Sequence, residues 1–71
     1  MWLDADFAGG RGRNSRGKTL PAAIREANKM LSAVIEGQVG IFTEYLVGHL
    51  LGYVIKTPET GTVFEPAPKE G

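Results

Sequence analysis

Residues 41–56, IFTEYLVGHLLGYVIK, decide the fold that this sequence predicts. Apolar side chains recur along it at steps of three and four residues, which is the spacing of an α-helix. The apolar circumference is interrupted only by Thr43, Glu44, His49 and Lys56. A helix that is apolar on all sides must be covered on all sides. A chain of 71 residues cannot supply that cover alone, so we expect this segment to pack against other copies or a larger assembly.

The stretch before it predicts another helix, which is amphipathic and about four turns long. Thr19 is a suitable N-cap because its hydroxyl can accept a free amide proton, and Pro21 suits a first helical turn. Polar side chains fall on the face opposite the apolar one. The apolar side chains recur at steps of four and three residues: Leu20, Ile24, Ala27, Leu31 and Val34.

Two glycines within residues 36–40, EGQVG, interrupt the helical pattern between these segments. Each glycine inside a helix costs about 1 kcal/mol relative to alanine. The sequence therefore predicts an all-α fold, either a two-helix hairpin or one long kinked helix over about residues 20–56. The corresponding organisation is an arm or loop over residues 1–19, a helical domain over 20–56 and an extended tail over 57–71.

The two ends of the chain carry weaker signals. Residues 1–8, MWLDADFA, fit either a short strand or an anchoring arm. Pro58 ends the preceding element because its ring disfavours an α conformation at the residue before it, and residues 59–61 predict a turn. Residues 62–64 fit either one short strand or an anchoring contact, before a proline-containing extended end.

Charge is distributed unevenly although the formal net charge is zero. Residues 1–35 carry six basic and three acidic groups, and residues 36–71 carry two basic and five acidic groups. Such asymmetry is typical of a chain that binds an anionic partner or contacts its own copies head to tail. We expect Asp4 and Asp6 to pair with the nearby arginines rather than to hold a cation.

An arginine- and glycine-rich arm, residues 9–19, contains no apolar side chain and cannot contribute to a core. Guanidinium groups bind phosphate oxygens in a bidentate manner. The arm is therefore either a solvated loop or a docking segment for an anionic partner, which is nucleic acid or an acidic protein surface. The four cations that would carry this binding are Arg11, Arg13, Arg16 and Lys18.

Residues 12–19, GRNSRGKT, also match the phosphate-loop consensus. In that motif successive backbone amides bind phosphates and the loop precedes a helix. No apolar strand clearly precedes the match, and a parallel sheet does not fit in a chain of this length. Phosphate or nucleotide binding is therefore a minor alternative to a basic arm.

The predicted second helix offers a packing surface. Gly48 and Gly52 lie one turn apart, which leaves a shallow groove where another backbone can approach closely. Ile41, Tyr45 and Ile55 align with this groove on the helical wheel. These five residues are the candidate helix-packing and oligomer contacts.

A single membrane span over about residues 33–55 is the alternative to a soluble assembly. Each apolar residue gains roughly 0.3–0.6 kcal/mol on insertion, and one ionised side chain near the centre costs about 2.5–3.5 kcal/mol. Glu44 therefore nearly cancels the gain for a lone span. We expect a protein that is cytoplasmic or lies within a larger particle, with a subunit of a membrane complex as the runner-up.

No constellation of residues supports an enzyme. His49 is the single histidine, and helical spacing separates it by about 140° from Glu44 on the wheel. The chain has no cysteine, and we predict no catalytic residue, no metal site and no cofactor. The sequence favours a non-enzymatic structural or interaction protein that self-associates or joins a larger assembly, such as a virion or nucleoprotein component.

Overall fold

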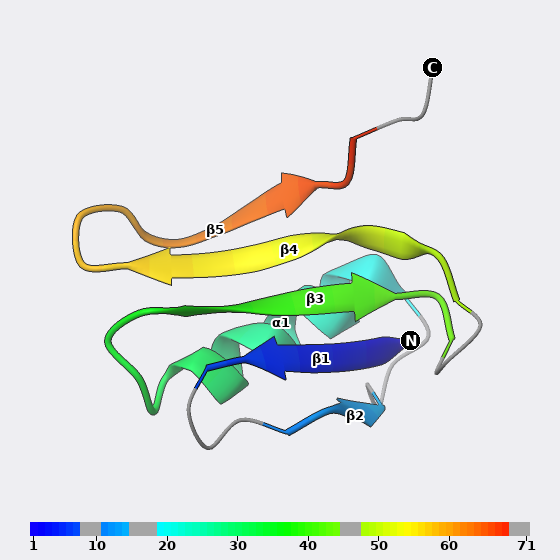
Figure 1. Cartoon of the computed structure of the whole chain (residues 1–71), viewed down its shortest axis with the longest axis horizontal. Coiled ribbons are helices and arrows are strands. Elements are labelled where there is room, and N and C mark those ends of the chain that lie inside the picture. The colour runs from blue at the N-terminus through cyan, green and yellow to red at the C-terminus, as the bar shows by residue number, and fades with distance from the viewer. Residues whose placement is uncertain (8–10, 15–18, 45–47, 69–71) are drawn as a thin grey trace.

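The computed structural model describes residues 1–7, 11–14, 19–44 and 48–68. Within them the chain forms, in order, β1 (Trp2–Asp6), β2 (Arg13–Asn14), α1 (Leu20–Leu31), β3 (Gly37–Phe42), β4 (Leu50–Thr57) and β5 (Gly61–Pro66). The strands make one antiparallel sheet in the order β2-β1-β3-β4-β5, and α1 lies across one face of it (Figure 1). The prediction of an all-α fold is therefore wrong, because most of the regular structure is strand.

The start of α1 confirms the first predicted helix. Thr19 is its N-cap, and the Thr19 hydroxyl oxygen accepts a hydrogen bond from the Ala22 backbone N–H at 3.4 Å. Pro21 lies in the first turn, where its missing N–H leaves no helical bond unmade. Ala23 and Ala27 are buried on the face that meets the sheet.

The helix ends three residues before Val34, the last member of the apolar series. Ser32 Oγ donates to the Lys29 carbonyl at 2.6 Å. The ammonium of Lys56, on β4, donates to the Leu31 carbonyl at 3.0 Å. Because these contacts satisfy carbonyls at the C-terminus of the helix, they support its end at this point.

Residues 41–56 do not form the predicted second helix. They contain the end of β3, a connection and most of β4, and the register pairs Val39 with Val54 and Gly40 with Tyr53. Val39, Ile41 and Val54 are buried against α1, while Tyr53 lies on the opposite face. β-branched and aromatic side chains favour such strands. The two-helix hairpin, the single kinked helix and the helical domain over residues 20–56 are accordingly wrong.

The C-terminal part of the chain forms a β-hairpin. The predicted turn is confirmed at residues 58–60, and of the two alternatives for residues 62–64 the structure has the strand, as part of β5. The Thr60 backbone N–H donates to Thr57 Oγ1 at 3.2 Å, which holds the turn. Gly61 has a φ of +69°, a left-handed conformation that glycine adopts without steric cost.

The N-terminal residues are a strand rather than a free arm. β1 lies inside the sheet between β2 and β3, and Leu3 is completely buried. β2 is only two residues long and pairs Arg13 with Leu3 and Asn14 with Trp2. The boundary of an arm at residue 19 therefore does not match the described structure, because residues 2–6 belong to the folded sheet.

One apolar core lies between α1 and the sheet. The alanines of α1 allow the helix backbone to approach the strands closely, and larger side chains of three strands fill the remaining space. Its fully buried members are Leu3, Ala23, Ala27, Leu31, Val39, Ile41 and Val54.

The predicted span over about residues 33–55 is replaced by β3, β4 and the residues around them. Among the residues that the structure describes, no helix is both long enough and apolar enough to cross a membrane.

Two matched substitutions distinguish the two faces of the sheet. Ile41 is completely buried beneath α1, whereas Ile55 is half-buried on the opposite face. We expect Ile41→Ala to lower the free energy of unfolding by about 2–5 kcal/mol and Ile55→Ala by about 1 kcal/mol or less. Urea denaturation measures both free energies of unfolding. If Ile41→Ala does not fold, Ile41→Val replaces it, with an expected loss of about 0.5–1.5 kcal/mol. Equal losses for the two alanine variants would contradict the two-layer arrangement.

Candidate functional site

The face of the sheet opposite α1 carries the candidate site, and we call it the open face. No helix of the described residues covers it (Figure 1). Since side chains alternate along each strand, the register assigns its members from four strands: Trp2, Asp4, Asp6, Gln38, Gly40, Phe42, Tyr53, Ile55, Val63 and Glu65.

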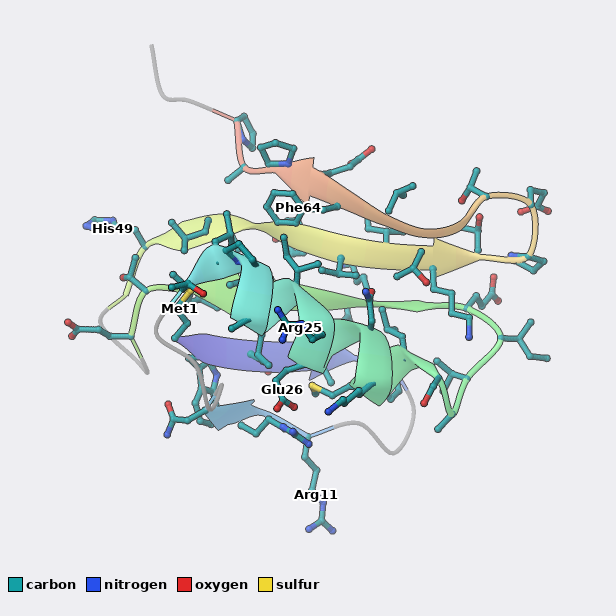
Figure 2. The ribbon with its side chains drawn as sticks, turned by 180° about the vertical axis from the view of Figure 1, so that it is seen from behind. Met1, Arg11, Arg25, Glu26, His49 and Phe64 are labelled. Carbon is teal, nitrogen blue, oxygen red and sulfur yellow. The ribbon has the colours of Figure 1, made fainter. Side chains whose placement is uncertain are left out.

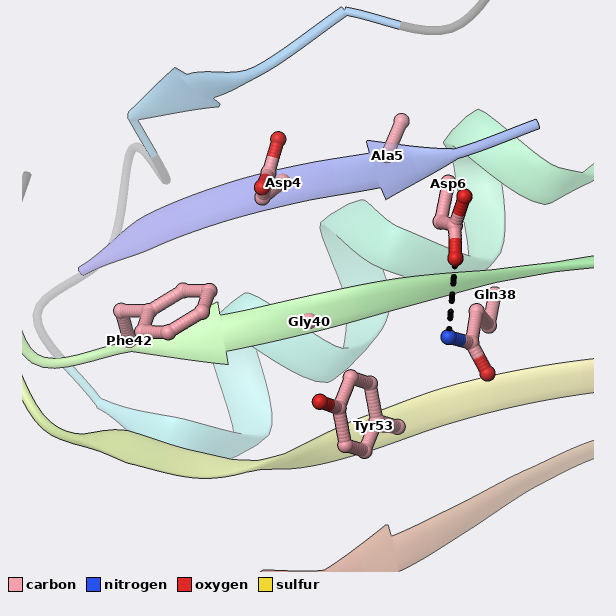
Figure 3. Close-up of a pocket in the computed structure, with 7 residues that line it drawn as sticks. All are labelled: Asp4, Ala5, Asp6, Gln38, Gly40, Phe42 and Tyr53. Carbon is pink, nitrogen blue, oxygen red and sulfur yellow. Dashed lines mark hydrogen bonds between the residues drawn. The ribbon is translucent and has the colours of Figure 1, made fainter. Parts of the chain in front are cut away.

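A shallow pocket lies at the centre of the open face. Its volume is about 210 Å³, and Gly40, which has no side chain, lies among its lining residues. A Cβ atom at Gly40 would lie 3.2 Å from Phe42 Cε1 and 3.4 Å from Tyr53 Cε1. The two rings therefore flank the bare backbone, and Figure 3 shows them together with the polar rim of the pocket. Its lining residues are Asp4, Ala5, Asp6, Gln38, Gly40, Phe42 and Tyr53.

Two exposed carboxylates of β1 give the pocket its charge. Asp4 and Asp6 lie two residues apart, so both project from the same face of the strand. Gln38 Nε2 donates to Asp6 Oδ2 at 3.0 Å and fixes that side chain (Figure 3). Asp4 makes no side-chain hydrogen bond or ion pair with another described residue. None of the described strand residues on the open face is lysine or arginine, so the charged side chains that these strands place there are all acidic.

The chemistry of this lining is recognition of positive charge. The faces of aromatic rings attract cations through their quadrupole, and a carboxylate accepts charge-assisted hydrogen bonds. Within the described part of the chain, no three His, Cys, Asp or Glu side chains gather in a way that could hold a metal ion. The pocket therefore suits an organic cation that has a flat or small head group.

Of the four cations of the predicted basic arm, the structure describes Arg11 and Arg13, which lie in different surroundings. Arg11 is exposed, and Arg13 on β2 forms an ion pair with Glu26 of α1. The Glu26 side chain is only 12% exposed, against 46% for Arg13, so the pair lies partly inside the protein. Arg16 and Lys18 lie outside the described residues. Figure 2, seen from the helix side, shows Glu26 on α1 and Arg11 extending from the edge of the sheet.

Only part of the phosphate-loop match lies within the described residues. Arg13 and Asn14 form an antiparallel edge strand, residues 15–18 lie outside the described part of the chain, and Thr19 is the N-cap of α1. The structure does not test phosphate binding by this segment, which stays a prediction.

The predicted packing groove does not form, because the helix that would carry it is absent. Ile41 lies in the core and Ile55 on the open face. Gly52 lies beneath Phe64, since a Cβ atom there would be 2.7 Å from the Phe64 ring. A Cβ atom at Gly48 would clash with the Glu44 backbone, and Tyr45 lies outside the described residues. These five residues therefore share no single surface, and their part in self-association stays untested.

The sequence does not predict the pocket, for two reasons. Asp4 and Asp6 were expected to pair with the arm, but Arg13 lies opposite Leu3 and pairs with Glu26 on the helix side instead. Gly40 falls in the predicted turn or kink, and Tyr53 falls in the predicted second helix. The alternation of Trp2, Asp4 and Asp6 was the one available signal, since a period of two indicates a strand with these side chains on one face.

Comparisons with known proteins identify no relative. No protein-family model, curated protein or solved structure matches this chain.

Substitution of Gly40 tests the pocket geometry. In Gly40→Ala the new methyl group meets two rings that border solvent and can move by a few tenths of an ångström. We expect the fold to persist with a change in stability within about 1 kcal/mol, while the aromatic NMR signals of Phe42 and Tyr53 shift.

Gly61→Ala is the matched control for this substitution. No heavy atom lies within 4 Å of its added methyl group, but the φ of +69° disfavours alanine. It should cost about 1 kcal/mol and leave the signals of both rings in place. Ring shifts in Gly61→Ala, or none in Gly40→Ala, would contradict the described pocket.

Proposed function

We propose that this chain is a non-enzymatic interaction protein whose open face binds an arginine side chain of a partner polypeptide. The observation that supports the proposal most directly is the pocket over Gly40, which is lined by two aromatic rings and by the Asp4 carboxylate, a group that pairs with no other described residue. The absence of basic strand residues from this face leaves the negative charge uncompensated within the described sheet.

The size of the pocket favours one side chain over a whole small molecule. Sites for drug-sized ligands occupy about 300–1,000 Å³, and this pocket has about 210 Å³. Its seven lining residues include no serine, cysteine, histidine or lysine, and the carboxylates, amide and aromatic rings that are present suit recognition of a cation.

Arginine fits the lining better than lysine does. A guanidinium group is planar, stacks on aromatic rings and can bind a carboxylate through two parallel hydrogen bonds. Phe42 and Tyr53 line the pocket with aromatic rings, and Asp4 lines it with a carboxylate. The ammonium group of lysine is a compact, strongly hydrated charge, and it does not stack on aromatic rings as a planar guanidinium does.

A single arginine at this exposed site binds weakly. An exposed cation–π contact contributes about 0.5–1 kcal/mol, and an exposed ion pair about 0.2–1 kcal/mol. Two rings and one carboxylate together fall short of the roughly 4.1 kcal/mol that corresponds to a Kd of 1 mM. The natural partner therefore adds further contacts along the open face, where Ile55 and Val63 continue the apolar surface.

NMR titration tests the proposal with a short acetylated and amidated peptide that contains one arginine. The expected result is a shift of the signals of Asp4, Gly40, Phe42 and Tyr53, with smaller shifts for the lysine peptide. A peptide with citrulline, which keeps the shape and loses the charge, should give no shift. Equal effects of arginine and citrulline peptides would contradict the proposal.

Asp4→Asn tests the role of the carboxylate. We expect it to weaken arginine-peptide binding about two- to fivefold, as the loss of an exposed ion pair predicts. Glu59→Gln removes the same charge from the exposed turn after β4 and should leave the affinity unchanged. Equal weakening by the two variants would indicate attraction by overall charge rather than a site.

An oligothymidine titration distinguishes the other class of partner. Nucleic acid would approach from the helix side, where Arg25 and Lys29 are exposed, and its affinity would fall steeply with salt. Shifts confined to that side would assign the partner to nucleic acid and exclude the open-face site as the principal one.

A further inference from the structure

The two edges of the sheet differ in length and accessibility. β2 forms one edge of the sheet and has only two residues, whereas β5 forms the other edge and has six. Short edge strands limit unwanted pairing, and long ones present rows of unpaired backbone groups. In Figure 1 β5 lies at the outer margin of the sheet, and no described strand pairs with its far side. β5 is therefore the edge at which another strand can add.

The hydrogen-bond pattern identifies which groups of β5 face outward. The Ala67 N–H donates to the Leu51 carbonyl at 3.0 Å, and pairs that exchange hydrogen bonds alternate along an antiparallel ladder. Pro66, which has no N–H, lies opposite Gly52 in the following pair and needs no bond there. By the same alternation, the N–H and C=O groups of Thr62 and Phe64 point away from β4.

The side chains at this edge suit strand pairing. Val63 is 43% exposed on the open face and lies opposite Ile55 of β4. Thr62, Val63 and Phe64 all favour extended structure. No lysine lies in β5, and its charged residue, Glu65, and its proline are both at the C-terminal end. The devices that usually block edge pairing are therefore absent from the middle of the strand.

We propose that two copies of this chain pair antiparallel through β5 and form a continuous ten-stranded sheet. The two-fold axis passes between Val63 and Val63 of the second copy. Thr62 of each copy then exchanges two backbone hydrogen bonds with Phe64 of the other.

This register agrees with the charges and with the backbone. The Val63 pair is a non-hydrogen-bonded pair, in which side chains approach most closely, and each Glu65 lies opposite Gly61 of the second copy. A register centred on Glu65 would place two carboxylates opposite each other, which is destabilising. A register centred on Phe64 would place Pro66 where an N–H donor is needed.

Sedimentation velocity of the full chain over a range of concentrations measures the association. Because the interface is small, we expect the 7.6 kDa monomer at low concentration and a dimer at concentrations approaching about 1 mM. Val63→Lys should weaken the dimer at least tenfold, since it places two ammonium groups at the axis. Ile35→Lys is the matched control, because Ile35 is 76% exposed outside the strands, and it should leave the dimer intact.

Cysteine crosslinking tests the register and does not depend on the lysine variants folding. The chain has no cysteine of its own. Val63→Cys should form a disulfide-linked dimer under mild oxidation, whereas Glu65→Cys, displaced from its counterpart by four residues along the strand, should not. A native chain that stays monomeric throughout, equal dissociation by Val63→Lys and Ile35→Lys, or equal crosslinking of the two cysteine variants would overturn the proposal.

Discussion

Apolar side chains on both faces of β3 and β4 are the constraint on which the rest of the structure depends. On one face Val39, Ile41 and Val54 are closed off by α1, whose alanines bring the helix backbone close to the strands. On the other face Phe42 and Tyr53 flank Gly40 and no described helix covers them. A single twelve-residue helix can cover only one face of the sheet, so the second face holds both the pocket and the remaining apolar surface.

Signals from neighbouring residues were sufficient to predict the start of α1 and the turn before β5. The Thr19 cap and the spacing from Leu20 placed α1, and Pro58 with its neighbours placed the turn before β5. The helix predicted over residues 41–56 is wrong because the period-two pattern of the strands cannot be seen in this segment. With apolar residues on both strand faces, alternation between polar and apolar side chains disappears, and a helix that is apolar all round fits the same letters. Only the β-branched and aromatic content favoured strands.

The site could not be read from the linear distribution of charge. Asp4 and Asp6 belong to the basic half of the sequence, yet alternation along β1 turns them to the open face. Lys56 belongs to the acidic half, yet it reaches the C-terminal carbonyl of α1. The fold therefore replaces a division between two halves of the chain by a division between two layers. Among the described residues, Asp4, Asp6 and Glu65 lie on the open face, whereas Arg25, Lys29 and Lys56 lie on the helix side together with the Arg13–Glu26 pair. Predicting that division requires the register of the strands, and the register could not be predicted from the sequence alone.

The arginine pocket and the β5 edge rest on separate observations, but their geometry connects them. A two-fold axis between antiparallel strands runs perpendicular to the sheet, so both open faces of a pair point the same way. With strands about 4.8 Å apart, five intervals separate the two copies of β3 by about 24 Å across the sheet. Gly40 is level with Glu65 in the register, so the two Gly40 pockets are also offset by four residues, about 13 Å, along the strands and lie roughly 27 Å apart. On the proposed function each pocket alone would bind one cation weakly, and a partner with two suitably spaced arginines would gain from the second site through effective concentration rather than through any new contact. Pairing at β5 would thus convert a weak open-face site into a bivalent one without changing a residue that lines it.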